Sequence, residues 1–528
     1  MRNNLKFNLP GSYDIQQLIS QLADQYPIKK EPDKDERIRF YDTFDWRLFN
    51  KSLVLYDESG KKLCLRKLNK NEIIYSLQIT STPVFISEFP DSRLREQLAP
   101  IIEMRALLKL AELQSRSTIY SFLNQNEKTV LRLAYEEIRR SPKKDTPALA
   151  TQLWLNPVRG YSGYARKMAE KLEEAGLTIS KGDDIYFKVL EAVDRKPGSY
   201  STKVNIKLDP DMRSDEATKV ILRFLLQIIR INQANIEKDL DTEFVHDFRV
   251  AIRRTRSALG QIKYVFPSKT TDRFKKDFAF LGKLSNELRD LDVYLLNENA
   301  YKDKLPQALR EEINPLFEYL RAKRSKALQR VINGLKSKQY AKILKDWEAF
   351  LNRPHKDSTT ASNAESPVID LARKRIYRKY RNVVKAGNLT LQNDDDKMLH
   401  VLRIHCKKLR YLMEFFSSLF PDKKINTLIK QLKKLQDNLG DFNDLRVQEE
   451  YLLNITGELP NTHPKFDKTL LAIGSLVGTL GKERKMVKDA FTKTFMDFKS
   501  PENKGLFREL FASQHHRVSH DNTGNLQQ

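Results

Sequence analysis

Two segments of the chain carry the same pattern of cationic residues, 154 positions apart. Each has a histidine followed by three basic residues at fixed spacing, namely His246, Arg249, Arg253 and Arg256 in the first copy and His400, Arg403, Lys407 and Arg410 in the second. At about 100° per residue, the four members of each copy fall within about 80° of one another around a helix. We call these two sets the basic ridges. Cations in such a row repel one another unless they meet an anion, so the ridges are predicted to bind a polyanion.

Further residues follow the same register. The offset of 154 also pairs Arg254 with Lys408, Lys276 with Lys430, and Asp290 with Asp444. One register over separated motifs indicates an internal duplication. We predict that these four cations join the ridges in binding and that the two aspartates orient the cations. The alternative is that the ridges are ordinary solvated faces, or are neutralised by acids on neighbouring helices.

The elements that position the ridges are predicted to be long helices. From about residue 215 onward, apolar residues recur every three or four positions, in Ala217–Leu240, Thr242–Phe266, Asp272–Asn299, Pro306–Leu351, Val368–Ala386, Asp395–Phe420, Ile425–Leu453 and Pro464–Lys493. This spacing predicts an all-α region. A low-complexity stretch, Asn352–Pro367, is predicted to be a flexible connection within it.

The first 200 residues are predicted to form β-strands with few helices. Runs of β-forming residues between turn residues occur at Leu5–Leu9, Arg37–Thr43, Ser52–Tyr56, Lys62–Leu68, Ile73–Thr80, Thr118–Asn124, Thr129–Tyr135 and Leu149–Leu155. Meandering strands favour an antiparallel sheet or barrel. The chain is therefore expected to be an α+β multidomain protein, with an antiparallel barrel-like domain before the all-α domain.

Composition narrows the class of partner. The 528 residues include 94 basic and 69 acidic residues, a net charge of +25, of which +19 lies beyond residue 200. A domain with this positive charge is expected to bind an anionic partner. Polyphosphate, nucleic acid and acidic membranes all remain candidates. No apolar run of 18 residues exists, so no membrane-spanning helix is expected. Cys64 and Cys406, the only cysteines, favour a reducing, cytoplasmic setting without disulfides or a thiolate metal cluster.

The duplicated motifs resemble the CHAD domain, the conserved histidine α-helical domain. The resemblance covers about residues 215–500 and includes Arg289-Asp-Leu-Asp-Val293 and Leu439-Gly-Asp-Phe-Asn-Asp444. It implies two four-helix bundles related by a pseudo-twofold axis, which meet at a basic cavity that binds inorganic polyphosphate. One departure is Asn286, where the family has the glycine that the second copy keeps as Gly440. This departure is expected to alter a helix junction without touching a cation.

Residues 1–205 resemble, more weakly, the CYTH fold of triphosphate tunnel metalloenzymes, through Tyr41-Asp-Thr43 and the strand Lys62–Leu68. The resemblance implies a tunnel-like barrel whose Glu-x-Glu-x-Lys motif holds a divalent metal against a triphosphate. The matching positions here are Arg2, Asn4 and Lys6, so both glutamates are lost. A hard dication needs several carboxylate oxygens. We therefore predict a catalytically degenerate domain with no catalytic residues, metal or cofactor.

Six cations of this domain are candidates for lining an anion-binding tunnel. They are Lys6, Arg37, Arg39, Arg66, Arg105 and Arg132. The alternative, which isolated strands favour, is that they are surface cations.

These inferences define the expected organisation and function. The expected domains are 1–205, which is CYTH-like, and 213–505, which is CHAD-like, with helical bundles at about 213–351 and 368–505 joined by a linker at 352–367. A disordered tail is expected at 506–528. The expected function is binding of inorganic polyphosphate in the cytoplasm, in association with polyphosphate granules. The alternatives are a metal-dependent triphosphatase or polyphosphatase activity of the N-terminal domain, and binding of RNA or DNA backbones.

Overall fold

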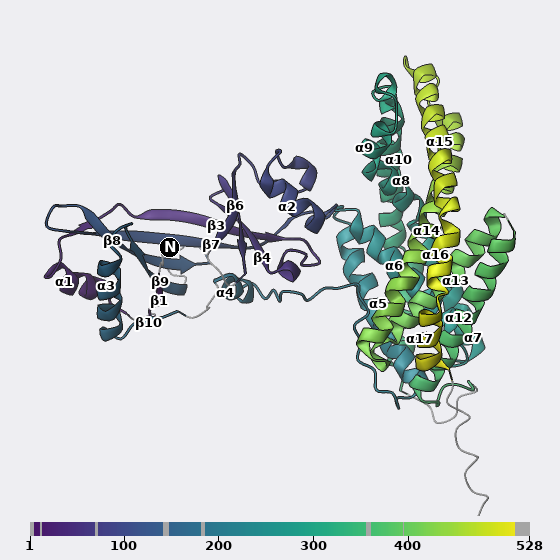
Figure 1. Ribbon diagram of the computed structural model, residues 1–528, viewed down its shortest axis with the longest axis horizontal. Coiled ribbons are helices and arrows are strands. Elements are labelled where there is room, and N and C mark those ends of the chain that lie inside the picture. The colour runs from purple at the N-terminus through teal and green to yellow at the C-terminus, as the bar shows by residue number, and fades with distance from the viewer. Residues whose placement is uncertain are drawn as a thin grey trace, which may run out of the picture. The chain divides into compact units, whose positions relative to one another are not determined.

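The chain divides into two compact units. The computed structural model describes residues 5–10, 13–68, 72–140, 147–180, 185–354, 361–393 and 395–512. The first unit spans residues 1–201 and contains all the strands, whereas the second spans residues 202–528 and is helical (Figure 1). The predicted order, an antiparallel sheet followed by an all-α region, is therefore confirmed.

The first unit is built on one antiparallel sheet. Its strands are β1 (Leu5–Asn8), β2 (Ile28–Lys30), β3 (Lys34–Asp42), β4 (Leu53–Glu58), β5 (Lys62–Lys67), β6 (Ile73–Gln78), β7 (Leu108–Leu123), β8 (Thr129–Arg139), β9 (Ala148–Pro157) and β10 (Thr178–Ile179). They are ordered β10-β1-β9-β8-β7-β3-β4-β5-β6, with β2 on β7. Among the residues described, no pairing joins the two end strands, β6 and β10.

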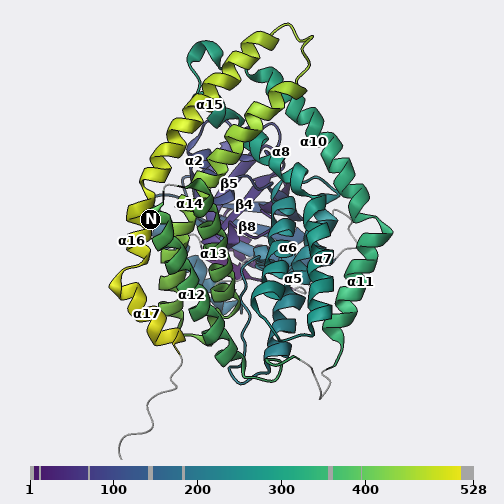
Figure 2. The same cartoon turned by 90° about the vertical axis from the view of Figure 1, so that its right-hand side faces the viewer.

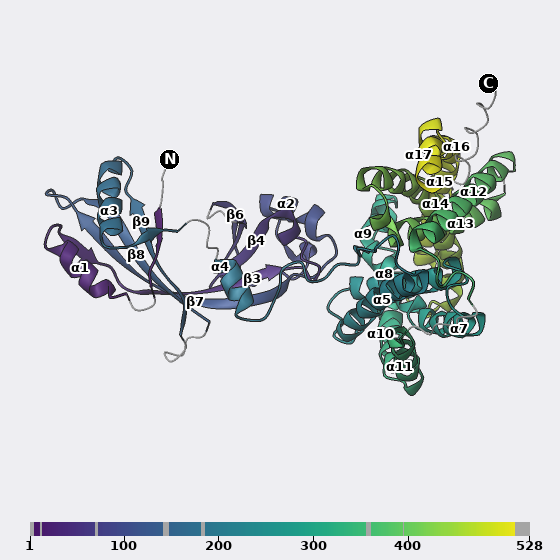
Figure 3. The ribbon, with the colours of Figure 1, turned by 90° about the horizontal axis from the view of Figure 1, so that it is seen from below.

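Strand alternation separates the two faces of this sheet. On one face, Phe7, Leu133 and Leu153 pack under α1 (Ile15–Ala23) and α3 (Ser162–Glu174). Their neighbours, Lys6 and Trp154 among them, therefore point to the other face. Part of that face is covered by α4 (Ile185–Glu191), and α2 (Arg93–Ile102) packs on the β4–β5 end (Figure 3).

The second unit consists of two halves with the same order of helices. The helices are α5 (Ser214–Ile236), α6 (Glu243–Gln261), α7 (Ser268–Leu284), α8 (Asn286–Leu296), α9 (Glu298–Asp303), α10 (Asn314–Leu335), α11 (Lys338–Asn352), α12 (Val368–Gln392), α13 (Asp396–Phe415), α14 (Asp422–Ile455), α15 (Phe466–Asp489), α16 (Phe491–Phe498) and α17 (Pro501–Phe511). The offset of 154 maps α5 onto α12, α6 onto α13 and α10 onto α15. The halves lie side by side, with α6 and α13 in contact at their centre (Figure 2).

The two halves differ at the helix junction flagged by Asn286. In the first half the chain breaks at Ser285, between α7 and α8, whereas α14 runs without a break through the matching Gly440. The predicted single helix Pro306–Leu351 is likewise divided. There α10 ends at Leu335, and the Ser337 hydroxyl accepts a hydrogen bond from the Tyr340 N–H at 3.2 Å to cap α11.

Two predicted boundaries change in the structure. Residues 506–511, expected in the tail, belong to α17, because Phe507 and Phe511 are fully buried. Residues 513–528, with His515 and His516, lie outside the described residues. The end of the predicted flexible connection is held in place, since the backbone N–H of Ser214 donates to Ser366 O at 3.0 Å and that of Asp215 to Ala364 O at 3.1 Å.

No helix in the described part of the chain is long and apolar enough to cross a membrane. Both cysteines, Cys64 and Cys406, are buried and form no disulfide.

A glycine on α12 marks a close contact that can be tested. A Cβ built on Gly387 would overlap the ring of Phe495, which is fully buried on α16. Gly387→Ala is therefore expected to destabilise the helical unit by about 1–3 kcal/mol, because the ring has to move. Thermal unfolding of the full chain, followed by far-ultraviolet circular dichroism, measures the effect.

Gly440→Ala is the matched control for that substitution. A Cβ at Gly440, inside α14, meets no atom within 4 Å. The helix propensity of alanine should then raise stability by up to about 1 kcal/mol. Equal effects of the two substitutions would contradict the close packing of α12 on α16.

Candidate anion-binding site

The basic ridges meet where α6 packs against α13. Both helices bury an apolar stripe, which includes Phe248 and Ile252 on α6 and Leu402 and Leu409 on α13. With these stripes in the cores of the two halves, the neighbouring cationic edges lie at the seam between the halves.

Two side-chain contacts join the ridge helices directly. The Arg253 Nε donates to the Tyr411 hydroxyl at 2.9 Å, and the Arg254 Nη2 donates to Glu414 Oε2, also at 2.9 Å. Glu414 also pairs with Arg410 at 3.4 Å, so one carboxylate joins guanidinium groups from both halves. These contacts fix the spacing of the two ridges.

A cavity of about 690 Å³ opens beside this seam. Nine of its lining residues are cationic and none is acidic, and the cations are Arg253, Arg256, Lys263, Lys275, Arg375, Arg378, Lys379, Lys407 and Lys408. They come from α6 and the loop after it, from α7, and from α12 and α13. The cavity is therefore a positively charged site built by both halves.

The charge of this cavity is largely uncompensated. Among the described residues, Lys275 alone of the nine has a carboxylate within 4.0 Å, that of Asp272 at 3.2 Å. The Arg375 Nη2 donates to the Lys263 carbonyl at 3.1 Å, a neutral partner. Surface cations of a folded protein commonly have acidic neighbours, so this set leaves an excess of positive charge at the cavity.

The electrostatic cost of the arrangement is visible in the pKa values. Burial, reinforced by Lys408, Lys263, Arg378 and Arg375, lowers the pKa of Lys379 to about 8. Burial, with Arg403 and Arg253 nearby, lowers the pKa of Lys407 to about 8 as well, although Asp444 opposes the change. An anion in the cavity would relieve both effects.

The predicted ligand residues divide into three groups. Arg253, Arg256, Lys407 and Lys408 line the cavity. Arg249 and Arg403 stand behind them, where burial lowers the pKa of both. The Arg403 Nη2 donates to Asp444 Oδ1 at 3.2 Å, and the Arg249 Nη1 donates to Asn286 Oδ1 at 2.5 Å. The expectation that Asn286 touches no cation is therefore wrong, because Asn286 lies one residue after the break between α7 and α8 and its amide reaches Arg249.

The other predicted residues lie outside the lining. Arg254 and Arg410 are paired with Glu414. Lys276, Lys430 and the exposed Asp290 do not line the cavity, and Lys275 does so in place of its neighbour Lys276. His246 is half-buried on α6, and the His400 Nδ1 is 3.0 Å from Asn443 Oδ1.

The cations that sequence reasoning missed come mainly from α12. At the offset of 154, Arg375, Arg378 and Lys379 correspond to Ile221, Phe224 and Leu225 of α5, so a search for repeated cations passes over them. Lys263 and Lys275 were missed for the same reason. These cations could have been found from composition, because residues 371–393 contain seven basic residues and no acidic residue.

The first unit has a smaller cavity of about 210 Å³ on the sheet face opposite α1 and α3. Lys6 and Arg66 line it together with Glu58 and Glu136. The Lys6 ammonium lies 5.6 Å from the Trp154 ring centroid. Most of the other lining residues are apolar, including Ile38, Phe40 and Leu113.

The other cations proposed for the N-terminal domain do not converge on this cavity. Alternation along β3 turns Arg37 and Arg39 away from the face of Phe40, and they pair with Glu112 at 3.4 Å and Asp57 at 3.0 Å. Arg132 pairs with Glu31 at 3.5 Å. Of the six cations proposed to line a tunnel, Lys6 and Arg66 alone line this cavity.

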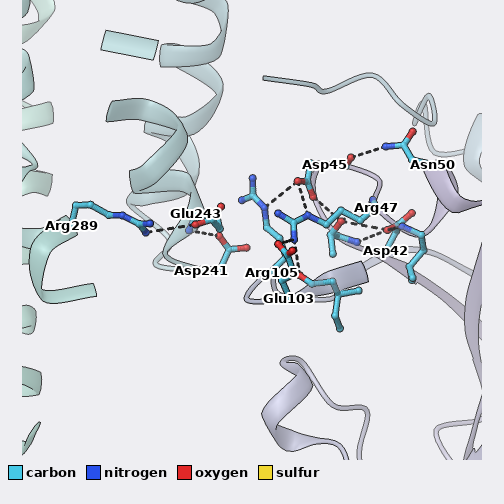
Figure 4. A network of polar contacts seen from close by, with 12 residues as sticks. Asp42, Asp45, Arg47, Asn50, Glu103, Arg105, Asp241, Glu243 and Arg289 are labelled. Atoms are coloured by element: carbon cyan, nitrogen blue, oxygen red, sulfur yellow. Dashed lines mark hydrogen bonds and ion pairs between the residues drawn. The ribbon is translucent and has the colours of Figure 1, made fainter. Parts of the chain in front are cut away.

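Arg105 has a structural role in a loop network. It is buried and lies 3.4 Å from Asp45, which Arg47 also approaches at 3.0 Å (Figure 4). Although burial opposes it, Arg105 and Arg47 hold the pKa of Asp45 below its ordinary value. In the second unit, Arg289 and Glu243 form a separate pair at 3.6 Å (Figure 4).

The residues around the smaller cavity do not fit a divalent metal. The carboxylates there are occupied, since Glu58 accepts from Lys62 Nζ at 3.3 Å and Glu136 accepts from Ser115 Oγ at 2.5 Å and Trp154 Nε1 at 3.0 Å. No group of three or more metal-binding side chains occurs within the described ranges. Arg2 and Asn4, at the lost glutamate positions, lie outside those ranges.

Part of the helical unit matches a known protein family. Residues 220–453 match the family model of the CHAD domain. Two uncharacterized proteins, from two strains of Mycobacterium tuberculosis, are each 26% identical over 213 residues, which is 40% of this chain. The match spans 40% of the length of these curated relatives.

Three solved structures resemble parts of the chain. The CHAD domain from the plant Ricinus communis is 24% identical with a TM-score of 0.48, covering 56% of this chain and 95% of that one. PptA from Streptomyces chartreusis is 14% identical with a TM-score of 0.43, covering 54% of this chain and 100% of that one. HpAC1 from Hippeastrum, described as having a dominant triphosphatase activity, is 16% identical with a TM-score of 0.26, covering 38% and 100%. All three TM-scores are below 0.5, so none of these likenesses decides the fold of this chain.

The lowered lysine pKa values predict a pH dependence of stability. Lys379 and Lys407 have a pKa of about 8 in the folded protein, against 10.5 for an ordinary lysine. Between these values the unfolded chain holds more protons, so the contribution of these lysines to stability rises from about pH 8 to about pH 10.5. Below pH 8 they are destabilising. A Lys379→Met/Lys407→Met variant should therefore be more stable than the original at pH 7, with the difference disappearing by about pH 10.5.

Thermal unfolding at a series of pH values, without polyvalent anions, checks this. Lys385→Met/Lys430→Met is the matched control, because both residues are exposed lysines of the second unit that do not line the cavity. The same pH dependence in both variants would contradict an electrostatic strain in the cavity.

Proposed function

We propose that this protein, whose residues 220–453 match the family model of the CHAD domain, binds inorganic polyphosphate in the cavity beside α6 and α13. The observation that carries the proposal is the lining of nine cations, of which Lys275 alone has a carboxylate within 4.0 Å among the described residues. A polymer with about one negative charge per phosphate matches such a lining without any need for base recognition.

The chemistry of the side chains supports a phosphate ligand. Four of the nine cations are arginines, whose planar guanidinium groups can each bridge two phosphoryl oxygens. The lysines add point charges that adapt to a flexible chain. Binding releases the counterions of the polymer and relieves the repulsion among the cavity cations, so both effects favour association.

Binding of RNA or DNA is the less favoured alternative. Single-stranded nucleic acids use aromatic rings on which bases stack. The one aromatic residue in the lining, Tyr411, is buried, and its hydroxyl accepts a hydrogen bond from Arg253. The cavity therefore offers phosphate contacts without a stacking platform.

For the first unit we propose an inactive relative of a triphosphate-processing domain. Its cavity keeps Lys6 and Arg66, but its carboxylates are engaged by neighbouring side chains. Without a metal to bridge and neutralise the phosphates, phosphoryl transfer lacks its main stabilising interaction. The alternative is residual triphosphatase activity, to which the helical unit would supply substrate.

The proposed setting follows from the proposed ligand. We propose that the protein acts in the cytoplasm and associates with polyphosphate granules where these form. A granule presents a high local concentration of the same anionic chain that the cavity would bind.

Removing cavity cations should weaken polyphosphate binding strongly. We expect the quadruple variant Arg253→Ala/Arg256→Ala/Arg378→Ala/Lys407→Ala to lose roughly 1,000-fold in affinity, from about 1 kcal/mol per cation and about 4 kcal/mol in all. The slope of log affinity against log salt should fall by about 3, since each cation contributes about 0.7. Calorimetry with long-chain polyphosphate across a salt series measures both quantities.

A control with the same charge change separates the cavity from net charge. Lys276→Ala/Lys385→Ala/Lys430→Ala/Lys434→Ala removes four exposed lysines that do not line the cavity. It should keep most of the affinity. Equal losses in the two variants would mean that the ridges are only part of a general basic surface. RNA or DNA that displaces polyphosphate at equal phosphate concentration would overturn the ligand assignment.

The proposal also predicts that the full chain does not hydrolyse tripolyphosphate. With magnesium or manganese present, phosphate release should be no faster than for the Lys6→Ala variant. Robust turnover that Lys6→Ala abolishes would establish an active first unit. Colorimetric phosphate assays distinguish the two results.

A further inference from the structure

The side of the cavity formed by α12 holds a lysine in an unusual setting. Lys379 is half-buried and lines the cavity. The position that corresponds to it in the first half is Leu225, so this amine belongs to one half alone.

The charged residues that line the cavity around Lys379 are all cationic, and the imidazole of His405 lies near its ammonium, where burial together with Lys379 and Lys408 lowers the pKa of His405. Arg375 and Arg378 come from its own helix, Lys408 from α13 and Lys263 from the loop after α6. No lining residue is acidic, and no carboxylate in the described part of the chain lies within 4.0 Å of its ammonium. Lys407, in contrast, has Asp444 nearby. A phosphate group near Lys379 would thus be attracted by the neighbouring cations without repulsion from a nearby carboxylate.

The same surroundings make the amine available as a nucleophile. Burial and the four neighbouring cations lower the pKa of Lys379 to about 8. At pH 7.5 about a quarter of the side chain is then the neutral amine, against about one part in a thousand for an ordinary lysine. The neutral amine is the form that attacks carbonyl carbon.

We propose that Lys379 is a modification site for acyl phosphates, small molecules in which an acyl group is joined to phosphate. Arg378 and Lys408, which have no carboxylate partner among the residues described, hold the phosphate. The Lys379 Nζ then attacks the adjacent carbonyl carbon. A C–N bond forms, the C–O bond to phosphate breaks, inorganic phosphate leaves, and the surplus proton of the amine passes to solvent. The product is an uncharged amide on Lys379.

This modification would regulate the proposed polyphosphate site, and that part of the inference rests on the proposed function. An amide at Lys379 removes one cation from the cavity and adds bulk to it, so polyphosphate binding weakens. A bound polyphosphate in turn occupies the phosphate position and favours the protonated amine. Acylation of Lys379 and binding of polyphosphate therefore oppose each other.

Acetyl phosphate is the probe that tests the proposal. The full chain is incubated with it at pH 7.5, and acetylation of each lysine is followed in time by peptide mass spectrometry. Lys379 should react at least about tenfold faster than Lys385, an exposed lysine on the same helix. Tripolyphosphate should slow the reaction of Lys379 at least about tenfold and leave Lys385 unchanged.

A reagent without phosphate separates docking from simple reactivity. The N-hydroxysuccinimide ester of acetate delivers the same acyl group, so its preference for Lys379 over Lys385 should be several-fold smaller. Arg378→Ala/Lys408→Ala should slow acetylation of Lys379 by acetyl phosphate and not by the ester. Equal preference with both reagents, or no preference for Lys379, would overturn the proposal.

The outcome for the polyphosphate site is read separately. Selective acetylation of Lys379 without protection by polyphosphate and without polyphosphate binding would support the modification site and overturn the proposed function. Polyphosphate binding without selective acetylation would support the proposed function and overturn the modification site.

Discussion

Repulsion among like charges at the seam between α6 and α13 is the constraint on which the second unit depends. Each half buries an apolar stripe that leaves a cationic edge at its margin, and packing the halves together brings the edges to one cavity. The hydrophobic cores of the halves supply the free energy that holds these charges close. An external anion in the cavity would relieve the repulsion that remains among these cations.

The sequence predicted the fold well where its pattern was periodic. The alternating strands and the long helices follow directly from the spacing of apolar residues, and the duplication predicted that α6 and α13 have equivalent roles. The helix break near Ser337 was missed, because it depends on local capping rather than on hydrophobic spacing. The altered helix junction at Asn286 was expected, although apolar spacing did not place the break at Ser285. Short strands such as β2 were missed for lack of any period.

The candidate site was predicted only in part, for a physical reason. A search for repeated residues finds what both halves share, such as Arg253 and Lys407, but the cavity is completed by α12, which has no basic counterpart on α5. In the first unit, single cations on strands gave no information about which face they occupy until pairing was known. Arg39 proved to lie on the face opposite the cavity, beside Asp57.

Glu414 gives the second unit a property beyond its own ion pairs. Because it holds Arg254 of one half and Arg410 of the other, the gap between the halves is set by a carboxylate outside the lining. The cations that line the cavity are thus spaced before a ligand binds, so binding requires little rearrangement of the protein. For the proposed polymer ligand, this preorganisation would lower the free-energy cost of ordering the site on association.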